Sequence, residues 1–435
     1  MGCAWVFSPG DLHLPSLSIG LLMASKSLAC SPACGAGKQA RCRGVAMLNR
    51  TILYAAHGER LLQYMLDSLE GSVELVNELS LEANIQFAVV DACRQHLYVA
   101  ISDAGAGKLG AKGSVHALKA YRILPDGSLE IWGQSVPLAE RPIHLAIDDQ
   151  RRYLFVAYNQ SAFLSMHPIA DDGGVEPAVE HTCLPKAGTF THQVMVCPMR
   201  RAVIALARGN DEVEGKAEEL GSVHTFSFED GQLKLVGENF FDSGIGPRHL
   251  VFHPVQPWVY VALERGNKLS MHYLHEDGRV QLPSKFQVEA LRDPRYLTLK
   301  KQRGGVIQIH PNGRFLYVSN RSDAVIRGRR HEVFAGGENS MAVFELDPVT
   351  GEPRLIQHVD THGIEARTFS IDPTGNMLIV ANQKSVWLEA GANDRRLLAC
   401  LAFFQIGEQG MLNFVGKHEM PDDGRWLLWM DTCAI

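Results

Sequence analysis

The sequence predicts an all-β fold, a seven-bladed β-propeller of four-stranded antiparallel blades. The first observation behind this prediction is a short apolar strand of the type LYVA, which recurs at spacings of roughly 45 to 60 residues. The second is that most copies follow another short strand across a turn. Regular repetition of one such unit favours a propeller over a β-sandwich or a pair of β domains. The copies begin at Leu53, Leu97, Leu154, Val203, Val259, Leu316 and Leu378.

Each repeat contains a β-hairpin, and residues 310–323, HPNGRFLYVSNRSD, illustrate it. Asn312-Gly313 readily adopts the positive φ angles of a tight turn. Phe315 to Val318 is aromatic and β-branched, which suits a half-buried strand. Further strand signals lie between the hairpins, for example at 223–237 and 341–359. Each repeat therefore supplies about four strands, the number in one propeller blade.

We expect the propeller to occupy residues 47–435. The apolar stretch WLLWM at 426–430 is expected to complete a blade with the N-terminal strands, which removes exposed sheet edges. Residues 1–46 carry four of the nine cysteines and one acidic residue. They predict a disordered N-terminal extension, or a stretch upstream of the true start at Met47. A lipoprotein signal and an organelle transit peptide are weaker alternatives, because no Lys or Arg precedes the apolar stretch.

Composition narrows the class of protein. A hydrophobic content of 46%, a charged content of 21% and a formal charge of −6 are ordinary for a soluble globular chain, and the charge argues against nucleic-acid binding. No apolar run is long enough to span a bilayer, so we expect no membrane partner. The nine cysteines have no metal-ligand spacing and suit a reducing compartment. We expect a cytoplasmic monomer or weak homo-oligomer without metal or cofactor.

Polar side chains recur at two fixed distances from the proline of the hairpin turn. One position lies six residues before the proline and the other ten residues after it. Because the strands of a hairpin are antiparallel, both positions lie at the same end of the blade. We therefore expect a ring of polar side chains at one mouth of the central channel. The first position holds His192, Arg248, Gly305 and Arg367, and the second holds Arg208, Glu264, Arg321 and Gln383.

The sequence resembles the seven-bladed propeller lactonase family, which includes bacterial 6-phosphogluconolactonases and fungal 3-carboxy-cis,cis-muconate lactonizing enzymes. The motifs that carry the resemblance are GPRHLVFHP (246–254) with the trailing Glu264, HPNGRFLYVSNR (310–321) and ARTFSIDPTGNMLIVANQKS (366–385). The resemblance implies an active-site group of His192, Arg248, Glu264 and Arg321.

This sequence departs from the family pattern at several points. Leu263 precedes Glu264 where family members usually have Asn. The loops at 101–114, 207–221 and 322–340 are long, and an insertion stands at 386–396. We expect these loops to border the channel mouth and to affect substrate size more than reaction type.

The residue types in the ring suit hydrolysis of an anionic lactone. Glu264 is a candidate general base or a holder of an arginine, and arginine neighbours should lower its pKa. His192 is an equal candidate for proton transfer. Arg248 and Arg321 are expected to clamp an anion and to stabilise an oxyanion. Further substrate contacts are expected from Arg367, Arg208 and Gln383.

Three functions remain open at this point. The leading hypothesis is metal-independent hydrolysis of a phosphorylated sugar lactone, most concretely a 6-phosphogluconolactonase of the pentose phosphate pathway. The second is a carboxymuconate-type lactonizing enzyme, and the third is a non-catalytic binding scaffold. A GxGxxG match at 105–110 does not favour a dinucleotide site, because residues 115–124 read as a strand and not as a helix.

Overall fold

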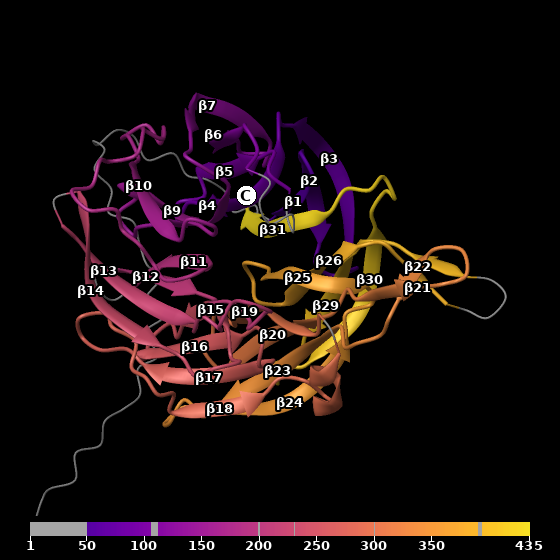
Figure 1. Cartoon of the computed structure of the whole chain (residues 1–435). Helices are drawn as coiled ribbons and strands as arrows, with labels where there is room; N and C mark the ends of the chain where they lie inside the picture. The colour runs from indigo at the N-terminus through magenta and orange to yellow at the C-terminus, as the bar shows by residue number, and fades with distance from the viewer. Residues whose placement is uncertain (1–49, 106–111, 199–200, 230, 300, 390–393) are drawn as a thin grey trace, which may run out of the picture. The chain divides into compact units, whose positions relative to one another are not determined.

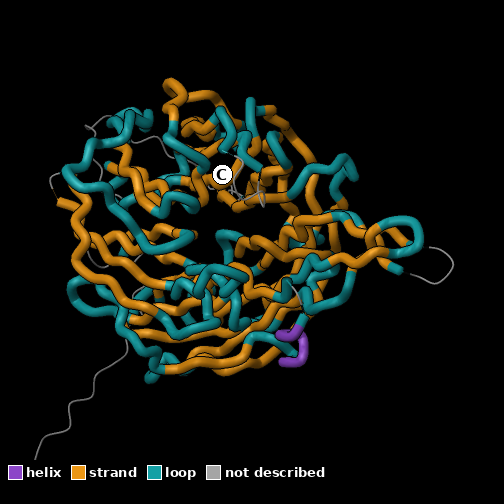
Figure 2. The backbone as a smooth tube through the Cα atoms, viewed as in Figure 1, coloured by secondary structure: helices purple, strands orange, loops and turns teal. Residues whose placement is uncertain are grey.

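The computed structural model describes residues 50–105, 112–198, 201–229, 231–299, 301–389 and 394–435. The extension predicted at 1–46 lies outside the described residues, and so does most of the glycine-rich segment at 105–110. The described strands form seven blades around a central axis, which confirms the predicted β-propeller (Figure 1). Strands dominate the backbone in Figure 2, where the short 3-10 helix η1 (Pro294–Thr298) is purple.

Six of the described blades are four-stranded antiparallel sheets that extend from the axis outward. Blade 1 contains, in that order, β31 (Leu427–Ala434), β1 (Thr51–His57), β2 (Arg60–Asp67) and β3 (Ser72–Ser80). Blade 2 contains β4 (Asn84–Val90), β5 (His96–Ser102), β6 (His116–Ile123) and β7 (Leu129–Pro137). Blade 4 contains β11 (Thr191–Val196), β12 (Ala202–Ala207), β13 (Ser222–Glu229) and β14 (Gln232–Phe240).

The remaining four-stranded blades lie in the C-terminal half of the chain. Blade 5 contains β15 (Pro247–Phe252), β16 (Trp258–Leu263), β17 (Lys268–Tyr273) and β18 (Phe286–Glu289). Blade 6 contains β19 (Arg303–Ile309), β20 (Phe315–Arg321), β23 (Ser340–Leu346) and β24 (Pro353–Asp360). Blade 7 contains β25 (Ile364–Ile371), β26 (Met377–Lys384), β29 (Cys400–Ile406) and β30 (Leu412–Glu419).

Blade 3 differs from the predicted four strands, because its sheet has three: β8 (Pro142–Ile147), β9 (Tyr153–Tyr158) and β10 (Phe163–Pro168). The segment that should form the fourth strand contains Gly173-Gly174, Pro177 and Pro185. Proline has no N–H for a sheet ladder, and glycine weakens a strand. The segment instead covers β10 through isolated bonds such as Val179 N to Met166 O, 2.8 Å.

A small sheet beside blades 6 and 7 corrects the expectation that the segments at 322–340 and 386–396 are loops. They contain two hairpins, β21 (Val325–Arg327) with β22 (Glu332–Phe334), and β27 (Val386–Leu388) with β28 (Arg395–Leu397). The parallel bridge Val333–Trp387 joins the hairpins into one four-stranded accessory sheet. This sheet projects from the side of the propeller (Figure 1).

The ring closes as the sequence predicts, through the C-terminal strand. β31 pairs antiparallel with β1, so both ends of the propeller share blade 1. The innermost strands contact one another in the order β31, β4, β8, β11, β15, β19, β25 and again β31. The hydrophobic core is divided into seven clusters, one between each pair of neighbouring blades. Stability therefore depends on blade-to-blade packing around the whole ring.

Candidate active site

A β-bulge on the innermost strand of every blade positions the candidate site. In β11, for example, Thr191 pairs with Ala207 and Gln193 with Leu206, which leaves His192 as the extra residue. A bulge turns the extra side chain out of the regular alternation of a strand. The bulges on the axis strands fall at Leu428, Gln86, Ile143, His192, Arg248, Gly305-Val306 and Arg367. The position six residues before the proline of the hairpin turn is thus the bulged position of the innermost strand.

The bulged side chains line one cavity. It has a volume of about 30 Å³, and each blade contributes to its wall. A space of this size holds water but not a sugar lactone, so a substrate would have to bind on its outer side. The residues from the bulges are Gln86, Ile143, His192, Arg248, Val306, Arg367 and Leu428. The structure therefore brings His192, Arg248 and Arg367 together as predicted.

Glu264, which follows β16, lies at the centre of an arginine cluster. Its Oε1 is 3.0 Å from Arg321 Nη2 and 3.3 Å from Arg208 Nη1. Its Oε2 is 3.5 Å from Arg248 Nε. Arg303, which neither of the two offsets selects, has its Nε 3.8 Å from Oε1. One buried carboxylate thus holds four guanidinium groups from blades 4, 5 and 6.

The electrostatic balance at Glu264 favours its anion. Burial raises the pKa of this carboxyl, but the charges of Arg208, Arg321 and Arg248 lower it more, so that the pKa lies well below 4.5. This direction agrees with the expectation from the sequence. The Glu264 side chain is only 2% exposed, so the arginines replace water as the stabilising environment for its charge. Glu264 is ionised throughout the neutral range.

His192 is neutral and has one ring nitrogen occupied. Arg248 Nε donates to His192 Nε2 over 3.2 Å, so the proton of the neutral ring is on Nδ1. Burial and the charge of Arg248 hold the pKa of His192 well below 6.5. The basic nitrogen of His192 thus already accepts a hydrogen bond, and which of His192 and Glu264 accepts the proton stays a prediction. His192 Nδ1 has no partner among the described residues and is available as a donor.

Arg321, the last residue of β20, is held on three sides. Its Nη2 bonds Glu264, its Nε donates to Gly304 O at 3.3 Å, and its Nη1 bonds Glu365. Sequence reasoning missed Glu365, a buried residue of β25. A signal for it exists: Arg303 and Glu365 both stand eight residues before the proline of their turn, a third shared offset. The position is occupied by Gly246 in blade 5.

Gln383 lies near the cluster without joining it through a hydrogen bond. It sits in β26 between the pairs Ile364–Lys384 and Ala366–Asn382, and therefore opposite Glu365. The side chain is buried, and its Nε2 has no partner within the described part of the chain. Its role as a substrate contact stays a prediction.

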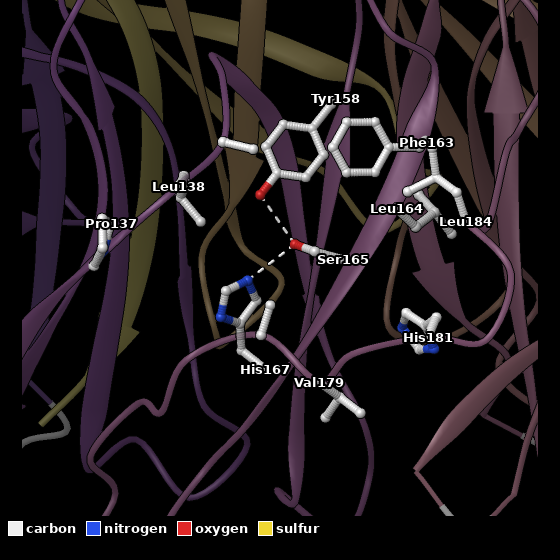
Figure 3. Close-up of a pocket in the computed structure, with 12 residues that line it drawn as sticks. Pro137, Leu138, Tyr158, Phe163, Leu164, Ser165, His167, Val179, His181 and Leu184 are labelled. Atoms are coloured by element: carbon white, nitrogen blue, oxygen red, sulfur yellow. Dashed lines mark hydrogen bonds between the residues drawn. The ribbon is translucent and has the colours of Figure 1, made fainter.

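A larger pocket in blade 3 contains a serine–histidine pair that could be mistaken for a nucleophile and its base. Ser165 Oγ lies 2.9 Å from His167 Nε2 and 2.9 Å from Tyr158 Oη (Figure 3). The same geometry recurs in blade 5 at Ser270 and His272, with 2.8 Å between Oγ and Nε2. It recurs again in blade 4 at Ser222 and His224, also at 2.8 Å. Repetition in three blades indicates a structural bond of the propeller rather than a catalytic site.

Comparison with known proteins identifies the family. A family model described as "Lactonase, 7-bladed beta-propeller" matches residues 50–397. The chain belongs to this lactonase family. A 6-phosphogluconolactonase of Enterobacter sp. (strain 638) is 25% identical to the lactonase over 389 residues, which cover 88% of this chain and 99% of that protein.

A 6-phosphogluconolactonase of Bacillus subtilis (strain 168) is 28% identical over 253 residues. That match covers 56% of this chain and spans 64% of the Bacillus protein. Among solved structures, a periplasmic gluconolactonase of Pseudomonas aeruginosa superposes with a TM-score of 0.66 at 21% identity, over 85% of this chain and 96% of that one. At this identity the superposition supports the fold alone.

Unpartnered donors around Glu264 define what the lactonase can bind. Arg248 Nη1, Arg208 Nε and His192 Nδ1 are buried and have no hydrogen-bond partner among the described residues. Buried donors without partners are rare in native proteins and point to groups that a ligand or water satisfies. Among the residues that the structure describes, no three His, Cys, Asp or Glu side chains are grouped as metal ligands. The same residues contain no helix that is long and apolar enough to cross a membrane. The absence of a metal cofactor stays a prediction.

Proposed function

We propose that this lactonase hydrolyses a phosphorylated sugar lactone, most concretely 6-phosphogluconolactone, to the open-chain acid. The observation that carries the proposal is the charge balance of the cluster. Five guanidinium groups share two buried carboxylates, those of Glu264 and Glu365, and Arg303 Nη2 also lies 3.6 Å from the exposed carboxylate of Asp211. The cluster has a net positive charge, which suits a dianionic phosphate and a developing oxyanion. The five are Arg208, Arg248, Arg303, Arg321 and Arg367.

The exposed side of the cluster is the place for the phosphate. The side chains of Arg208 and Arg303 are each 30% exposed, whereas those of Arg248 and Glu264 are 2% exposed. An anion arriving from solvent meets the two outer arginines first. The lactone ring then faces the inner donors, Arg248 Nη1 and His192 Nδ1, which can stabilise the charge that forms on the carbonyl oxygen.

Glu264 is the proton acceptor in this proposal. A water molecule attacks the lactone carbonyl, and Glu264 takes a proton from that water. The bond between the carbonyl carbon and the ring oxygen then breaks, and the ring oxygen receives a proton from solvent or from the protonated Glu264 carboxyl. The low pKa of Glu264 makes it a weak base, so positioning and oxyanion stabilisation must supply most of the acceleration. Arg321 holds Glu264 rather than clamping substrate with its full fork, because three of its N–H groups already have protein partners.

The decisive experiment measures hydrolysis of freshly generated 6-phosphogluconolactone, with unphosphorylated gluconolactone as the matched substrate control. We expect the phosphorylated lactone to have the higher kcat/KM, and Glu264→Gln to reduce kcat by about 100-fold. Arg321→Ala should reduce kcat as well. Equal rates for both lactones would contradict a phosphate site.

Other outcomes would select another function. An intact protein that does not exceed the spontaneous rate would contradict this substrate, and carboxymuconate-type lactones would be tested next. Activity that survives both substitutions would place the chemistry elsewhere. Specific binding without turnover of either lactone class would favour the scaffold.

We also propose that the protein works in the cytoplasm. Cys93, Cys183, Cys400 and Cys433 carry free thiols, which suits a reducing compartment. The periplasmic gluconolactonase of P. aeruginosa with the same fold is the reason to test this directly, by fractionating cells that express the full chain. The expectation of a monomer or weak homo-oligomer stays a prediction.

A further inference from the structure

We propose that Glu365 is a positioning residue of this site: its carboxylate fixes the guanidinium of Arg321 against Glu264, and Asn339 holds the backbone of Glu365. The inference rests on the proposed function, since it concerns the orientation of the proposed proton acceptor. Three independent features of the structure support it.

The first feature is the arrangement of the two carboxylates on one guanidinium. Arg321 Nη1 bonds Glu365 Oε1, while Nη2 lies 3.0 Å from Glu264 Oε1. All three side chains are nearly inaccessible to solvent, with exposed fractions of 9%, 4% and 2% for Arg321, Glu365 and Glu264. A guanidinium is planar, so fixing one of its nitrogens fixes the direction of the others. The Glu365 contact therefore orients the side of Arg321 that faces Glu264.

The second feature is the backbone at Glu365. This residue has φ of 63°, a left-handed conformation that residues with a side chain seldom adopt. The equivalent residue of blade 5 is Gly246, with φ of 58°. Phe190, at the same position of blade 4, has φ of 55°, whereas Arg303 of blade 6 does not have a positive φ. Three of these four blades thus place a left-handed residue here, a conformation that glycine adopts most easily. A glutamate at this position has a strained backbone, and its carboxylate lies in the arginine cluster. Strained backbone conformations of this kind cluster at functional sites.

The third feature is Asn339, which comes from the segment that carries the β21–β22 hairpin. Its Oδ1 accepts from the N–H of Glu365 at 2.8 Å and from the N–H of Ser322 at 3.1 Å. Its Nδ2 donates to Ser322 O at 3.1 Å. One buried amide thus joins the residue after Arg321 to the backbone of Glu365. Because both bonds to Oδ1 come from N–H groups, the orientation of the amide is fixed by the network.

The charges agree with this geometry. Burial lowers the pKa of Arg321, but the neighbouring carboxylates, Glu365 before Glu264, raise the pKa overall above its ordinary value. Glu365 also offsets the mutual repulsion of Arg321, Arg248 and Arg367. Without Glu365, Arg321 Nη1 would lose its partner, and only Glu264 and the 3.3 Å bond from Nε to Gly304 O would hold the guanidinium. Glu264 would then lose a fixed direction toward the attacking water.

A purely structural role for Glu365 would have a different signature. Loss of a buried counter-charge would lower the melting temperature and the amount of folded protein, while the folded fraction would retain its kcat. A positioning role predicts a fall in kcat in protein that remains folded, with little change in KM, because the affected interaction acts in the chemical step.

The experiment compares four substitutions in the full-length protein: Glu365→Gln, which keeps the shape; Glu365→Gly, which relieves the left-handed backbone; Asn339→Ala; and Glu338→Gln as control. Glu338 is a buried carboxylate of the same segment. It accepts from the backbone N–H of Arg292, from Ser340 and, at 3.5 Å, from Asn320 Nδ2, and within the described part of the chain no ion pair joins it to an arginine side chain of the cluster. Kinetics with 6-phosphogluconolactone and thermal unfolding are measured for each. A double variant, Glu365→Gln with Arg321→Ala, completes a mutant cycle.

We expect Glu365→Gln and Glu365→Gly to lower kcat by about tenfold or more with KM changed by less than about threefold, the size of effect expected when a hydrogen bond to a charged group is lost. Asn339→Ala should lower kcat in the same direction, and Glu338→Gln should not. In the Arg321→Ala background, Glu365→Gln should cause no further loss, since Glu365 acts through Arg321.

Two outcomes would overturn the inference while leaving the proposed function intact. One is wild-type kcat in folded Glu365→Gln and Glu365→Gly. The other is a double variant whose loss equals the product of the two single losses. If the wild-type protein does not hydrolyse the phosphorylated lactone, the proposed function fails, and the same cycle is measured by calorimetric binding of 6-phosphogluconate. Non-additive losses of affinity would then support the coupling of Glu365 to Arg321, whereas additive losses or no binding would overturn it.

Discussion

Glu264 remains an anion in a site from which water is almost fully excluded. Three close arginines and a fourth at 3.8 Å supply the stabilisation that solvent gives to a surface carboxylate. Removing one partner of such a cluster leaves an uncompensated buried charge, which is why substitutions here should affect folding as well as function. An exchange of Arg248 for lysine would not be conservative either, since Arg248 contacts both His192 and Glu264 through Nε, and lysine carries its only side-chain nitrogen at the end of the chain.

The pH dependence of activity tests the charge states of the two candidate proton acceptors. The pKa of Glu264 lies well below 4.5 and that of His192 well below 6.5, so neither group changes its charge between about pH 6 and pH 8. We therefore expect kcat/KM to be constant over this range after subtraction of the spontaneous reaction. A rise in kcat/KM with a midpoint near the ordinary histidine pKa of 6.5 would contradict the neutral, hydrogen-bonded His192 and would return it to the role of base.

Stability toward acid follows from the same carboxylate. Because the pKa of Glu264 is lower in the folded protein than its ordinary value of 4.5, the unfolded chain takes up the proton first as the pH falls. The stabilisation from the ionised Glu264 is fully present above about pH 4.5 and is lost progressively below it, toward the folded-state pKa. Urea unfolding at pH 7 and at pH 4 should show a larger loss of stability for wild type than for Glu264→Gln. An equal loss in both proteins would contradict this contribution.

At the scale of single elements, the repeated bulge explains why the two offsets predicted the cluster. The offset of six residues corresponds to the bulged position in β11, β15 and β25. A fixed distance from the turn proline therefore predicts the channel-facing side chain, although the bulge itself cannot be recognised in the sequence. The offset of eight residues was overlooked because its occupants are chemically mixed. Gly246 gives no polar signal there, whereas Arg303 and Glu365 join the cluster.

Two elements could not be predicted from local patterns. The accessory sheet depends on pairing between β22 and β27, which are more than 50 residues apart and too short to stand out in the sequence. Pro177 and Pro185 disfavour a fourth strand in blade 3, but the regular repeat of the sequence predicts one. Pairing between distant short strands and exceptions to a repeat therefore could not be predicted from the sequence.

The serine–histidine bonds of the third strands belong to the same repeat, and they give an element-scale prediction. We expect Ser165→Ala to retain wild-type kcat and to lower the free energy of unfolding by about 1–3 kcal/mol, because its Oγ makes two buried hydrogen bonds, to Tyr158 and His167. Ser270→Ala is the matched control, because its Oγ bonds His272 in the same way. Loss of lactone hydrolysis in Ser165→Ala alone, measured beside chemical denaturation of both variants, would instead identify the blade 3 pocket as a reactive site.

At the scale of the whole molecule, the propeller has a basic cluster at the bulges and acidic side chains along its channel. The channel, about 460 Å³ in volume, is lined by the residues that follow the bulges and includes Asp148, Asp149 and Asp431. The anionic lactone of the proposed function would therefore be attracted to the arginine side and repelled from the channel, so the two sides of the ring differ in charge.

The acidic side chains of the channel differ in their surroundings. Burial, and then the charge of Asp148, raises the pKa of Asp149, while burial raises that of Asp431. Asp149 is exposed, so water stabilises its anion and the carboxylate contributes negative charge to the channel at neutral pH. The charge difference between the arginine cluster and the channel therefore persists under the conditions in which a lactonase would work.

Ring closure through β31 makes the two ends of the chain unequal in their effect on folding. Four residues of β31 are buried in the clusters on both sides of blade 1: Leu427, Trp429, Met430 and Cys433. Among the described strands, β31 is the only partner for the inner edge of β1.

A chain that ends at residue 426 loses these contacts, worth about 1.5–3 kcal/mol for each large apolar side chain, and exposes a strand edge that favours aggregation. We expect it to fail to fold, whereas a chain that starts at Met47 should keep the melting temperature and the lactone hydrolysis of the full protein. Circular dichroism melting and size-exclusion chromatography of both truncations provide the test. A folded monomer without residues 427–435 would contradict closure through blade 1, and a large loss of stability without residues 1–46 would show that the N-terminal segment belongs to the folded unit.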